Sequence, residues 1–245
     1  MEVAIIAAGC FWCTEAIFKR LIGVEQVEVG FAGGHQPNPS YREVCKGFTG
    51  HAEAIRITYD PKQLSYMDIL EVFWQAHDPT SVNKQGDDEG EQYRSAIFYL
   101  NESQHQAALL SRELIAQAFD TPIATEIVPA GTFYPAQEEY LMNYYENNTD
   151  RGYCIFTIAP KINKIHDLFQ KRIKPTYQAL EHENRTQKTL WGGYAYGNPS
   201  QGCATGSGYY SYYQRPNGLS NYCGLWSLGG QPASLCIPRP MGKSH

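Results

Sequence analysis

Residues 3–21 read VAIIAAGCFWCTEAIFKRL and indicate a strand followed at once by a helix. The run over residues 3–8 is apolar throughout, which is typical of a buried strand. Residues 10–21 favour a helix, because part of one face is apolar, formed by Ala16, Ile17, Phe18 and Leu21. The stretch therefore predicts the first strand and the first helix of a layered domain.

The same mixture of patterns continues outward to about residue 176. Apolar or alternating runs predict further strands over residues 27–31, 52–59, 95–99, 123–128 and 154–158. Helical spacing of apolar residues predicts helices over residues 64–75, 104–119, 136–145 and 161–172. Because strands and helices mix throughout, we expect one domain of α/β or α+β class over residues 1–176.

The composition changes after this domain. From about residue 184 the chain is rich in Gly, Tyr, Ser, Asn and Pro and poor in aliphatic residues, and no Asp or Glu follows Glu183. Such a segment buries too little apolar area to offset the entropy of ordering it. We therefore expect residues 177–245 to form a flexible C-terminal extension.

The overall composition is that of a globular protein, with 42% hydrophobic and 18% charged residues. A net charge of −5 argues against a broad nucleic-acid-binding surface. No apolar run approaches the roughly 20 residues that cross a bilayer, and the N-terminus resembles no targeting peptide. We expect a cytoplasmic monomer with no membrane or nucleic-acid partner. Its seven cysteines would stay reduced there unless they carry out redox chemistry.

Two of these cysteines, Cys10 and Cys13, lie at the start of the first predicted helix. Free amides and the helix dipole favour a thiolate there, so the pKa of Cys10 is expected to be lowered. Cys13 follows one turn later, within reach of Cys10. A zinc site would need a second pair of ligands at matching spacing, and the chain offers none. The pair is thus either a redox dithiol, or a nucleophile beside an apolar pocket walled by Phe11 and Trp12.

Two further segments extend the pattern. Residues 38–53 read NPSYREVCKGFTGHAE, and residues 77–94 read HDPTSVNKQGDDEGEQYR. Together with GCFW at residues 9–12, they resemble the type A peptide methionine sulfoxide reductases over residues 3–172. The resemblance implies a two-layer sandwich, in which a mixed sheet with a ferredoxin-like βαβ core carries flanking helices.

The resemblance also implies a role for each matching residue. Cys10 would attack the sulfur of methionine sulfoxide and become a sulfenic acid. Glu53 would protonate the sulfoxide oxygen, which requires a poorly solvated carboxyl that keeps its proton near neutral pH. The other positions match phenols that hydrogen-bond this oxygen, an acid that shapes the site, and a cage for the substrate methyl group: Tyr41 and Tyr93, Asp88, and Phe11 with Trp12. A pocket of this kind distinguishes the S epimer.

Several neighbouring residues could be confused with this set. Asp87 could replace Asp88 if the register shifts by one residue. His51 and His77 are interpreted as turn or packing residues, because the chemistry needs an acid rather than an imidazole. Arg94 is expected to pair with a carboxylate, and Cys45 is expected to be a small buried residue.

A sulfenic acid must next be resolved by a second thiol, giving a disulfide that thioredoxin reduces. Cys13 is the first candidate and Cys154, in a Gly-Tyr-Cys sequence, the second. The extension offers Cys223 and Cys236 as a third. We expect no bound cofactor or metal. Two other hypotheses stay open: a general thiol-disulfide oxidoreductase using Cys10 and Cys13, and a module that binds oxidised methionine without turnover.

Overall fold

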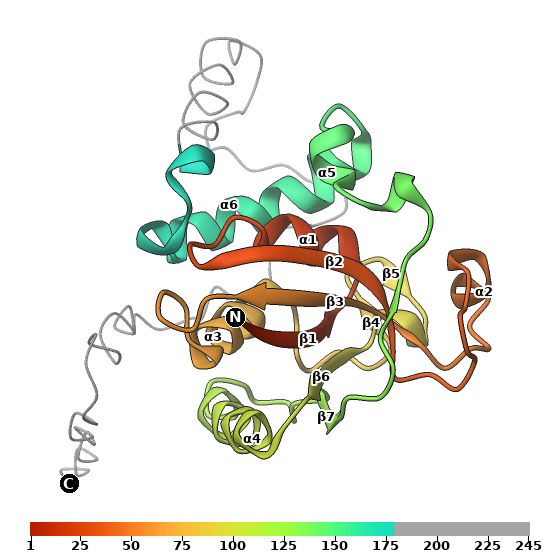
Figure 1. Cartoon of the computed structure of the whole chain (residues 1–245), viewed down its shortest axis with the longest axis horizontal. Helices are drawn as coiled ribbons and strands as arrows, with labels where there is room; N and C mark the ends of the chain where they lie inside the picture. Colours follow the sequence, from red (N-terminus) through yellow and green to blue (C-terminus); the bar gives the residue numbers. More distant parts are fainter. Residues whose placement is uncertain (179–245) are drawn as a thin grey trace, which may run out of the picture. The chain divides into compact units, whose positions relative to one another are not determined.

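The computed structural model describes residues 1–178, and a mixed six-stranded sheet forms the centre of this part (Figure 1). In spatial order the strands are β7 (Glu126–Pro129), β6 (Ser95–Tyr99), β1 (Glu2–Ala8), β3 (Ala52–Tyr59), β2 (Val24–Ala32) and β8 (Tyr134–Pro135). β1 pairs antiparallel with β3 and β6, β2 and β8 extend the sheet antiparallel beyond β3, and β7 runs parallel to β6.

The central four strands have the ferredoxin-like arrangement. Chain order is β1, α1 (Phe11–Phe18), β2, β3, α3 (Tyr66–Ala76) and β6, whereas spatial order is β6-β1-β3-β2. Alternate residues of β1 serve different faces: Ala4, Ile6 and Ala8 join the cluster that includes the helices, and Ile5 and Ala7 join the cluster on the other face. The predicted fold class is confirmed.

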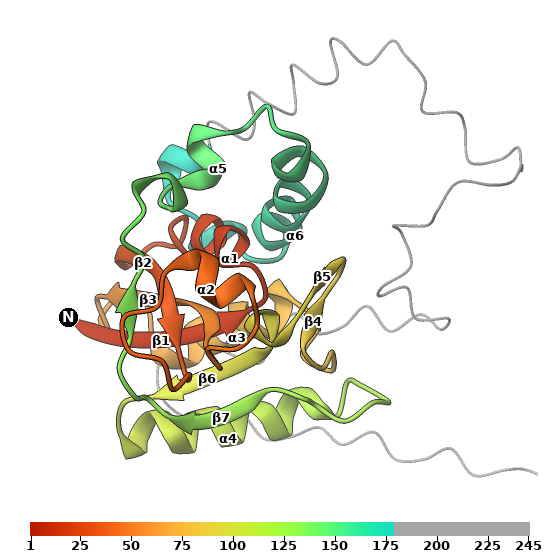
Figure 2. The same cartoon turned by 90° about the vertical axis from the view of Figure 1, so that its right-hand side faces the viewer.

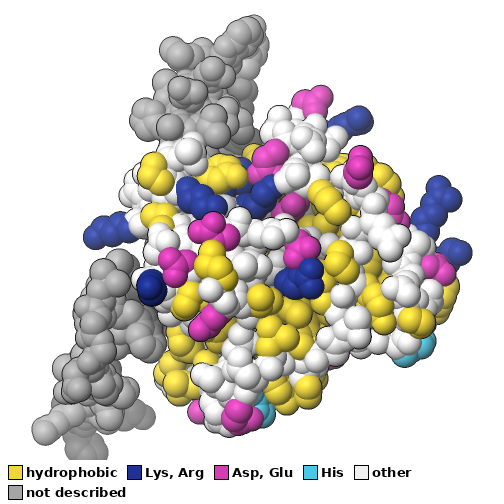
Figure 3. Space-filling model, in the orientation of Figure 1, with side chains coloured by type: hydrophobic (Ala, Val, Ile, Leu, Met, Phe, Trp, Pro, Cys, Tyr) yellow, Lys and Arg dark blue, Asp and Glu magenta, His cyan; other side chains and the backbone are white. Residues whose placement is uncertain are grey.

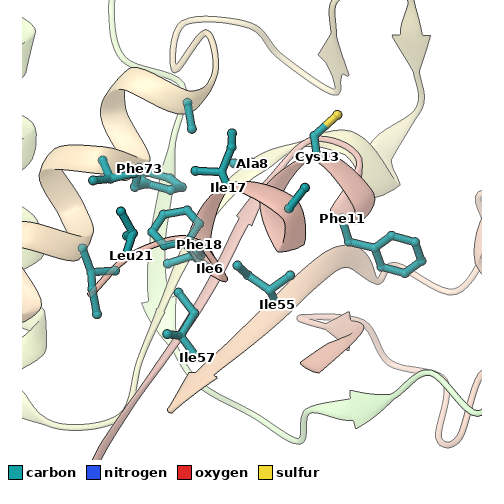
Figure 4. Packing of buried hydrophobic residues seen from close by; sticks show 14 of the residues in the cluster. Ile6, Ala8, Phe11, Cys13, Ile17, Phe18, Leu21, Ile55, Ile57 and Phe73 are labelled. Carbon is teal, nitrogen blue, oxygen red and sulfur yellow. The ribbon is translucent and has the colours of Figure 1, made fainter. Parts of the chain in front are cut away.

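The main core lies between the sheet and the helices (Figure 4). Ile17 and Phe18 of α1 and Phe73 of α3 are at most 1% exposed and share one cluster with Ile55 and Ile57 of β3. The opposite face has a smaller cluster of mainly alanines with Phe98 and Phe133. The sheet is thus covered by helices on one face, which makes the domain two-layered.

Two further helices flank this unit. α4 (Glu102–Ala116) lies beside β6 and β7, and α6 (Ala159–Leu168) lies beside α1 (Figures 1 and 2). On the face shown in Figure 3, acidic and basic side chains of the described residues are interspersed. Within residues 1–178, no helix has the length and apolar character that a membrane crossing requires.

Two predicted elements are wrong. Residues 136–145 form no continuous helix: η2 (Glu139–Leu141) and α5 (Tyr144–Asn147) are separated by Asn143, whose φ of 52° is left-handed. Residues 154–158 form no strand. They are η3 (Cys154–Ile158), a π-helical turn that leads directly into α6.

The π turn has a local cause in the sequence. Pro160 stands in the first turn of α6, lacks an N–H and crowds the carbonyl four residues before it, so the helix widens there. The burial pattern fits a helix as well, since Cys154 and Ile158 are buried while Ile155 and Phe156 are exposed. The expectations for residues 179–245 lie outside the described residues, and the domain boundary at residue 176 stays a prediction.

Candidate active site

Cys10 is held at the junction of β1 and α1 by a glycine turn. Gly9 adopts a φ of 84°, and a Cβ there would lie 2.7 Å from the side chain of Gln85, so this position requires glycine. Cys10 is the N-cap residue of α1 and Cys13 lies in its first turn. Both cysteines are free thiols, 5% and 2% exposed respectively.

Glu53 supplies a carboxyl group to the same place. It lies on β3 opposite Phe31 and is 1% exposed, and its Oε2 accepts a hydrogen bond of 3.0 Å from the backbone N–H of Phe11. Burial raises the pKa of Glu53 to about 8, although the hydrogen bond from Phe11 offsets part of this effect. At neutral pH this carboxyl therefore holds a proton, as expected for the general acid predicted at this position.

The pKa of Cys10 is raised, contrary to the prediction that the helix N-terminus would lower it. Burial is the main cause, and Cys13 and Glu53 add to it. The first amide of α1 donates to Glu53 instead of stabilising the Cys10 sulfur. The pKa of Cys13 is lowered to about 7, first by a hydrogen bond with Cys10 and then by the charge of Lys161. Of the two thiols, Cys13 is therefore the one that loses its proton first and carries the negative charge.

The two phenols of the resemblance lie near Glu53. Tyr41 is the first residue of α2 (Tyr41–Cys45), which Ser40 begins with a capping box. Tyr93 ends the short 3-10 helix η1 (Glu91–Tyr93). Burial raises the pKa of both phenols, and the negative charge of Glu53 adds to the effect. Both hydroxyls thus stay protonated and can donate hydrogen bonds.

Asp88 is connected to the thiols through Tyr153. Tyr153 donates a hydrogen bond of 2.8 Å to Asp88 Oδ2, and its hydroxyl also hydrogen-bonds Cys10. Asp88 is half-buried on β5 (Asp88–Glu89), whereas Asp87 is exposed, which favours the predicted register. Sequence reasoning missed Tyr153, although it noted the Gly-Tyr-Cys sequence; the signal was a phenol next to a candidate resolving cysteine.

Aromatic residues that adjoin the thiols contact one another. Tyr144 stacks on Trp12 with ring centroids 3.7 Å apart, and Tyr153 meets the edge of Trp12 at 6.0 Å. Phe11 is fully buried under Tyr41, with centroids 5.9 Å apart. Trp12 Nε1 and Glu53 Oε1 are buried without a hydrogen-bond partner among the described residues.

Phe11 and Trp12 thus lie beside Cys10 as predicted, but their contact with a substrate methyl group stays a prediction. The two rings are also not equivalent. Trp12 is partly exposed and contacts Tyr144 and Tyr153, while Phe11 is completely buried, with its ring centroid 6.1 Å from that of Trp12.

Both histidines have structural partners. His51 Nδ1 accepts from the N–H of Gly34 at 3.0 Å, and Nε2 contacts the carbonyl of Gln36 at 2.8 Å. His77 lies between the carbonyl of Phe73 at 2.8 Å and Ser95 Oγ at 2.6 Å, and burial lowers its pKa to about 4. The interpretation of both histidines as packing or turn residues fits these contacts.

The predictions for Arg94 and Cys45 had opposite outcomes. The Nε of Arg94 lies 3.3 Å from Glu126, so the expected pairing with a carboxylate is present. Cys45 is exposed, and the expectation that it is buried is wrong. It ends a five-residue helix of which only Val44 is buried, so α2 projects from the core.

The other resolving candidates differ in what the structure shows. Cys154 is completely buried in η3, and the pKa of its thiol is raised by burial and then by the charge of Cys13. Cys203, Cys223 and Cys236 lie outside the described residues. In the described part of the chain, no three His, Cys, Asp or Glu side chains are grouped closely enough to hold a metal ion.

A dithiol at a helix N-terminus beside a protonated, buried carboxyl defines a thiol-dependent oxidoreductase. Comparison with known proteins gives the family. The family profile described as peptide methionine sulfoxide reductase matches residues 2–173. The chain belongs to the peptide methionine sulfoxide reductase family.

Relatives of type A agree with this assignment. Peptide methionine sulfoxide reductase MsrA of Deinococcus radiodurans is 52% identical over 178 residues, which cover 71% of this chain and 84% of the relative. The protein of the same name from Acinetobacter baumannii (strain AYE) is 49% identical over 174 residues, 71% of this chain and 99% of the relative.

Solved structures of similar fold carry matching names. Methionine sulfoxide reductase A of Corynebacterium diphtheriae has a TM-score of 0.55 and 38% identity, covering 60% of this chain and 75% of that chain. Reduced Mxr1 from Saccharomyces cerevisiae has a TM-score of 0.58 and 32% identity, covering 62% of this chain and 88% of that chain.

Proposed function

We propose that this chain reduces the S epimer of methionine sulfoxide, free or within proteins, with Cys10 as the nucleophile. The observation that carries the proposal is Glu53, a carboxyl that is 1% exposed, with a pKa of about 8, one hydrogen bond from the residue after Cys10. A sulfoxide oxygen must be protonated before it can leave, whereas thiol-disulfide exchange expels a thiolate, which is a far better leaving group.

In the first step, the sulfur of Cys10 attacks the sulfoxide sulfur while Glu53 gives its proton to the sulfoxide oxygen. Tyr41 and Tyr93 donate hydrogen bonds to that oxygen and hold it on one side of the pocket, which selects the S epimer. The bond between the two sulfurs then breaks as the oxygen passes to Cys10 as a hydroxyl group, and the proton that the Cys10 thiol gives up returns to Glu53. Methionine leaves, reduced by two electrons, and Cys10 becomes the sulfenic acid, oxidised by two electrons.

Cys13 then resolves the sulfenic acid. Its thiol already hydrogen-bonds Cys10, and residues three apart on a helix lie about 5–6 Å apart at Cβ, so a small local adjustment allows a disulfide. Cys154 ranks second because it is buried within η3, and Cys223 and Cys236 rank third. A thioredoxin supplies the dithiol that reduces the bridge, and the protein works as a monomer whose catalytic domain spans residues 1–176.

A thiol count tests the proposal. The reduced, desalted chain receives excess methionine S-sulfoxide without reductant, the remaining thiols are titrated, and the disulfide is mapped by peptide mass spectrometry. We expect two thiols to disappear and a Cys10–Cys13 bridge to form. The R epimer serves as the substrate control and Cys45→Ser as the matched variant, since Cys45 is exposed on α2 and should not take part.

The outcomes separate the hypotheses. Retention of all thiols would remove the reductase proposal and favour a binding module. A bridge between Cys10 and Cys154, Cys223 or Cys236 would keep the reductase but exclude Cys13 as the resolving residue. Reduction of insulin disulfides without any response to sulfoxide would support the general oxidoreductase.

A further inference from the structure

Lys161 contacts the proposed resolving cysteine. Its Nζ lies 3.6 Å from Cys13 Sγ, and the side chain of Lys161 is partly buried on α6. The two residues are 148 positions apart in the chain, so the contact depends on the packing of α6 against α1. Lys161 belongs to none of the motifs that carry the family resemblance.

The π turn sets the direction in which Lys161 points. A π turn holds one residue more than an α turn, and one residue corresponds to a rotation of about 100° around the helix. Without η3, the residues of α6 would present a different face to α1. One turn later, Lys164 Nζ donates to the carbonyl of Gln75 at 2.7 Å, which joins the same helix to the end of α3.

Lys161 differs in charge from the other groups that face Cys13. The thiols of Cys10 and Cys154, the hydroxyl of Tyr153, and the carboxyl groups of Asp88 and Glu53 all interact with this sulfur. Each of these groups is neutral or negative, whereas the ammonium of Lys161 is positive. Cys13 is 2% exposed, so water offers its thiolate little stabilisation, and a nearby cation has a large effect there.

We propose that Lys161 is a positioning residue that holds Cys13 as a thiolate directed at Cys10 and thereby sets the rate at which the sulfenic acid is resolved. This inference rests on the proposed function, specifically on Cys13 as the resolving cysteine. In the step concerned, the Cys13 thiolate attacks the sulfur of the Cys10 sulfenic acid. The S–S bond forms, the S–O bond breaks, and the departing hydroxide takes a proton from Glu53 or solvent to become water.

The test measures resolution separately from methionine formation. Reduced protein is mixed with one equivalent of methionine S-sulfoxide between pH 5.5 and 9, and samples are quenched over time. Methionine, dimedone-trapped sulfenic acid and the Cys10–Cys13 disulfide are then quantified. The variants are Lys161→Met, Lys161→Gln and Lys161→Arg, with Lys171→Met as control, because Lys171 is exposed and its loss changes the net charge equally.

The neutral variants should slow disulfide formation at pH 7 roughly tenfold or more, accumulate trapped sulfenic acid, and move the midpoint of the pH profile up by at least about one unit. Lys161→Arg should restore most of the rate, and Lys171→Met should behave as wild type. A loss of packing alone would lower the rate without moving the midpoint. If one neutral variant fails to fold, the other carries the test, and the pH dependence of Cys13 alkylation in that variant and in wild type measures the midpoint directly.

Three results would overturn the inference, and they are distinguishable. If the Cys10–Cys13 bridge forms at the wild-type rate and midpoint in Lys161→Met, Lys161 has no such role, although the proposed function stands. If the wild-type bridge joins Cys10 to another cysteine, both the inference and the resolving assignment fail. If no methionine forms at all, the proposed function itself fails.

Discussion

Replacing Glu53 by Gln should stabilise the folded protein, and the gain should depend on pH. Glu53 is buried with a pKa of about 8, against an ordinary value of 4.5 in the unfolded chain. Below pH 4.5 the carboxyl is protonated in both the folded and the unfolded chain. In that range the burial of Glu53 takes nothing from the free energy of unfolding. Between pH 4.5 and 8 the unfolded chain loses this proton while the folded chain keeps it, so folding becomes less favourable as pH rises.

The size of the effect follows from the shift. Each pH unit between these limits removes about 1.4 kcal/mol from the free energy of unfolding, which amounts to about 3 kcal/mol at pH 7. Gln is neutral at every pH, and its carbonyl can keep the hydrogen bond from the Phe11 N–H that Glu53 Oε2 now accepts. Glu53→Gln therefore avoids this loss, and its advantage over the wild type should widen steadily between pH 5 and 8.

The assay is denaturant unfolding of the reduced wild type and Glu53→Gln at several pH values across this range. Glu113→Gln is the control, because Glu113 is exposed on α4. A stability difference that stays constant from pH 5 to 8 would refute the reasoning, since Glu53 would then ionise in the folded chain as it does in the unfolded one. The stabilised variant should lose about 10²- to 10⁴-fold in methionine formation, as expected for removal of a general acid.

Three further substitutions test other parts of the structure. Tyr153→Phe removes the hydroxyl that bonds Asp88 and Cys10 and should slow single-turnover methionine formation about tenfold or more, measured by rapid quench; an unchanged rate would exclude Tyr153 from the chemistry. Cys154→Ser should keep thioredoxin-dependent turnover, and a loss of turnover with accumulated sulfenic acid would transfer resolution to Cys154. Phe73→Ala should lower the free energy of unfolding by about 3–5 kcal/mol in denaturant titration, because Phe73 is completely buried. A smaller loss would mean that neighbouring side chains move into the cavity.

Strong apolar patterns were sufficient to predict most of the sheet. β3 and β6 occupy residues 52–59 and 95–99 as predicted, and β1 differs by one residue. The short run at residues 154–158 was wrong, because an apolar run of this length fits a strand or a buried helix equally well. The deciding feature was Pro160 just beyond it, which widens the helix instead of ending it.

The sequence motifs identified candidate residues that lie together in the structure, but the pKa of Cys10 could not be predicted from its position. Motif matching identified Cys10, Glu53, Tyr41, Tyr93 and Asp88, and the structure brings all five into one neighbourhood. The pKa of Cys10 was predicted from its position at the helix N-terminus alone. The amide that was expected to stabilise its thiolate is bonded to Glu53, 42 residues away, and no local pattern shows such a contact.

Burial raises the pKa of both Glu53 and Cys13, which are at most 2% exposed, but the two groups differ in what opposes this effect. Within residues 1–178, no cation is among the interactions that set the pKa of Glu53, so burial keeps the proton that the sulfoxide oxygen must receive. Cys13 has a hydrogen bond with Cys10 and then the charge of Lys161 at 3.6 Å, and together they let its thiolate form in an equally buried environment. That charge in turn helps to raise the pKa of Glu53. Removal of the lysine charge should therefore also lower the pKa of Glu53. In Lys161→Met, the pH above which methionine formation declines should then fall. The midpoint of the pH profile for disulfide formation should rise in the same variant.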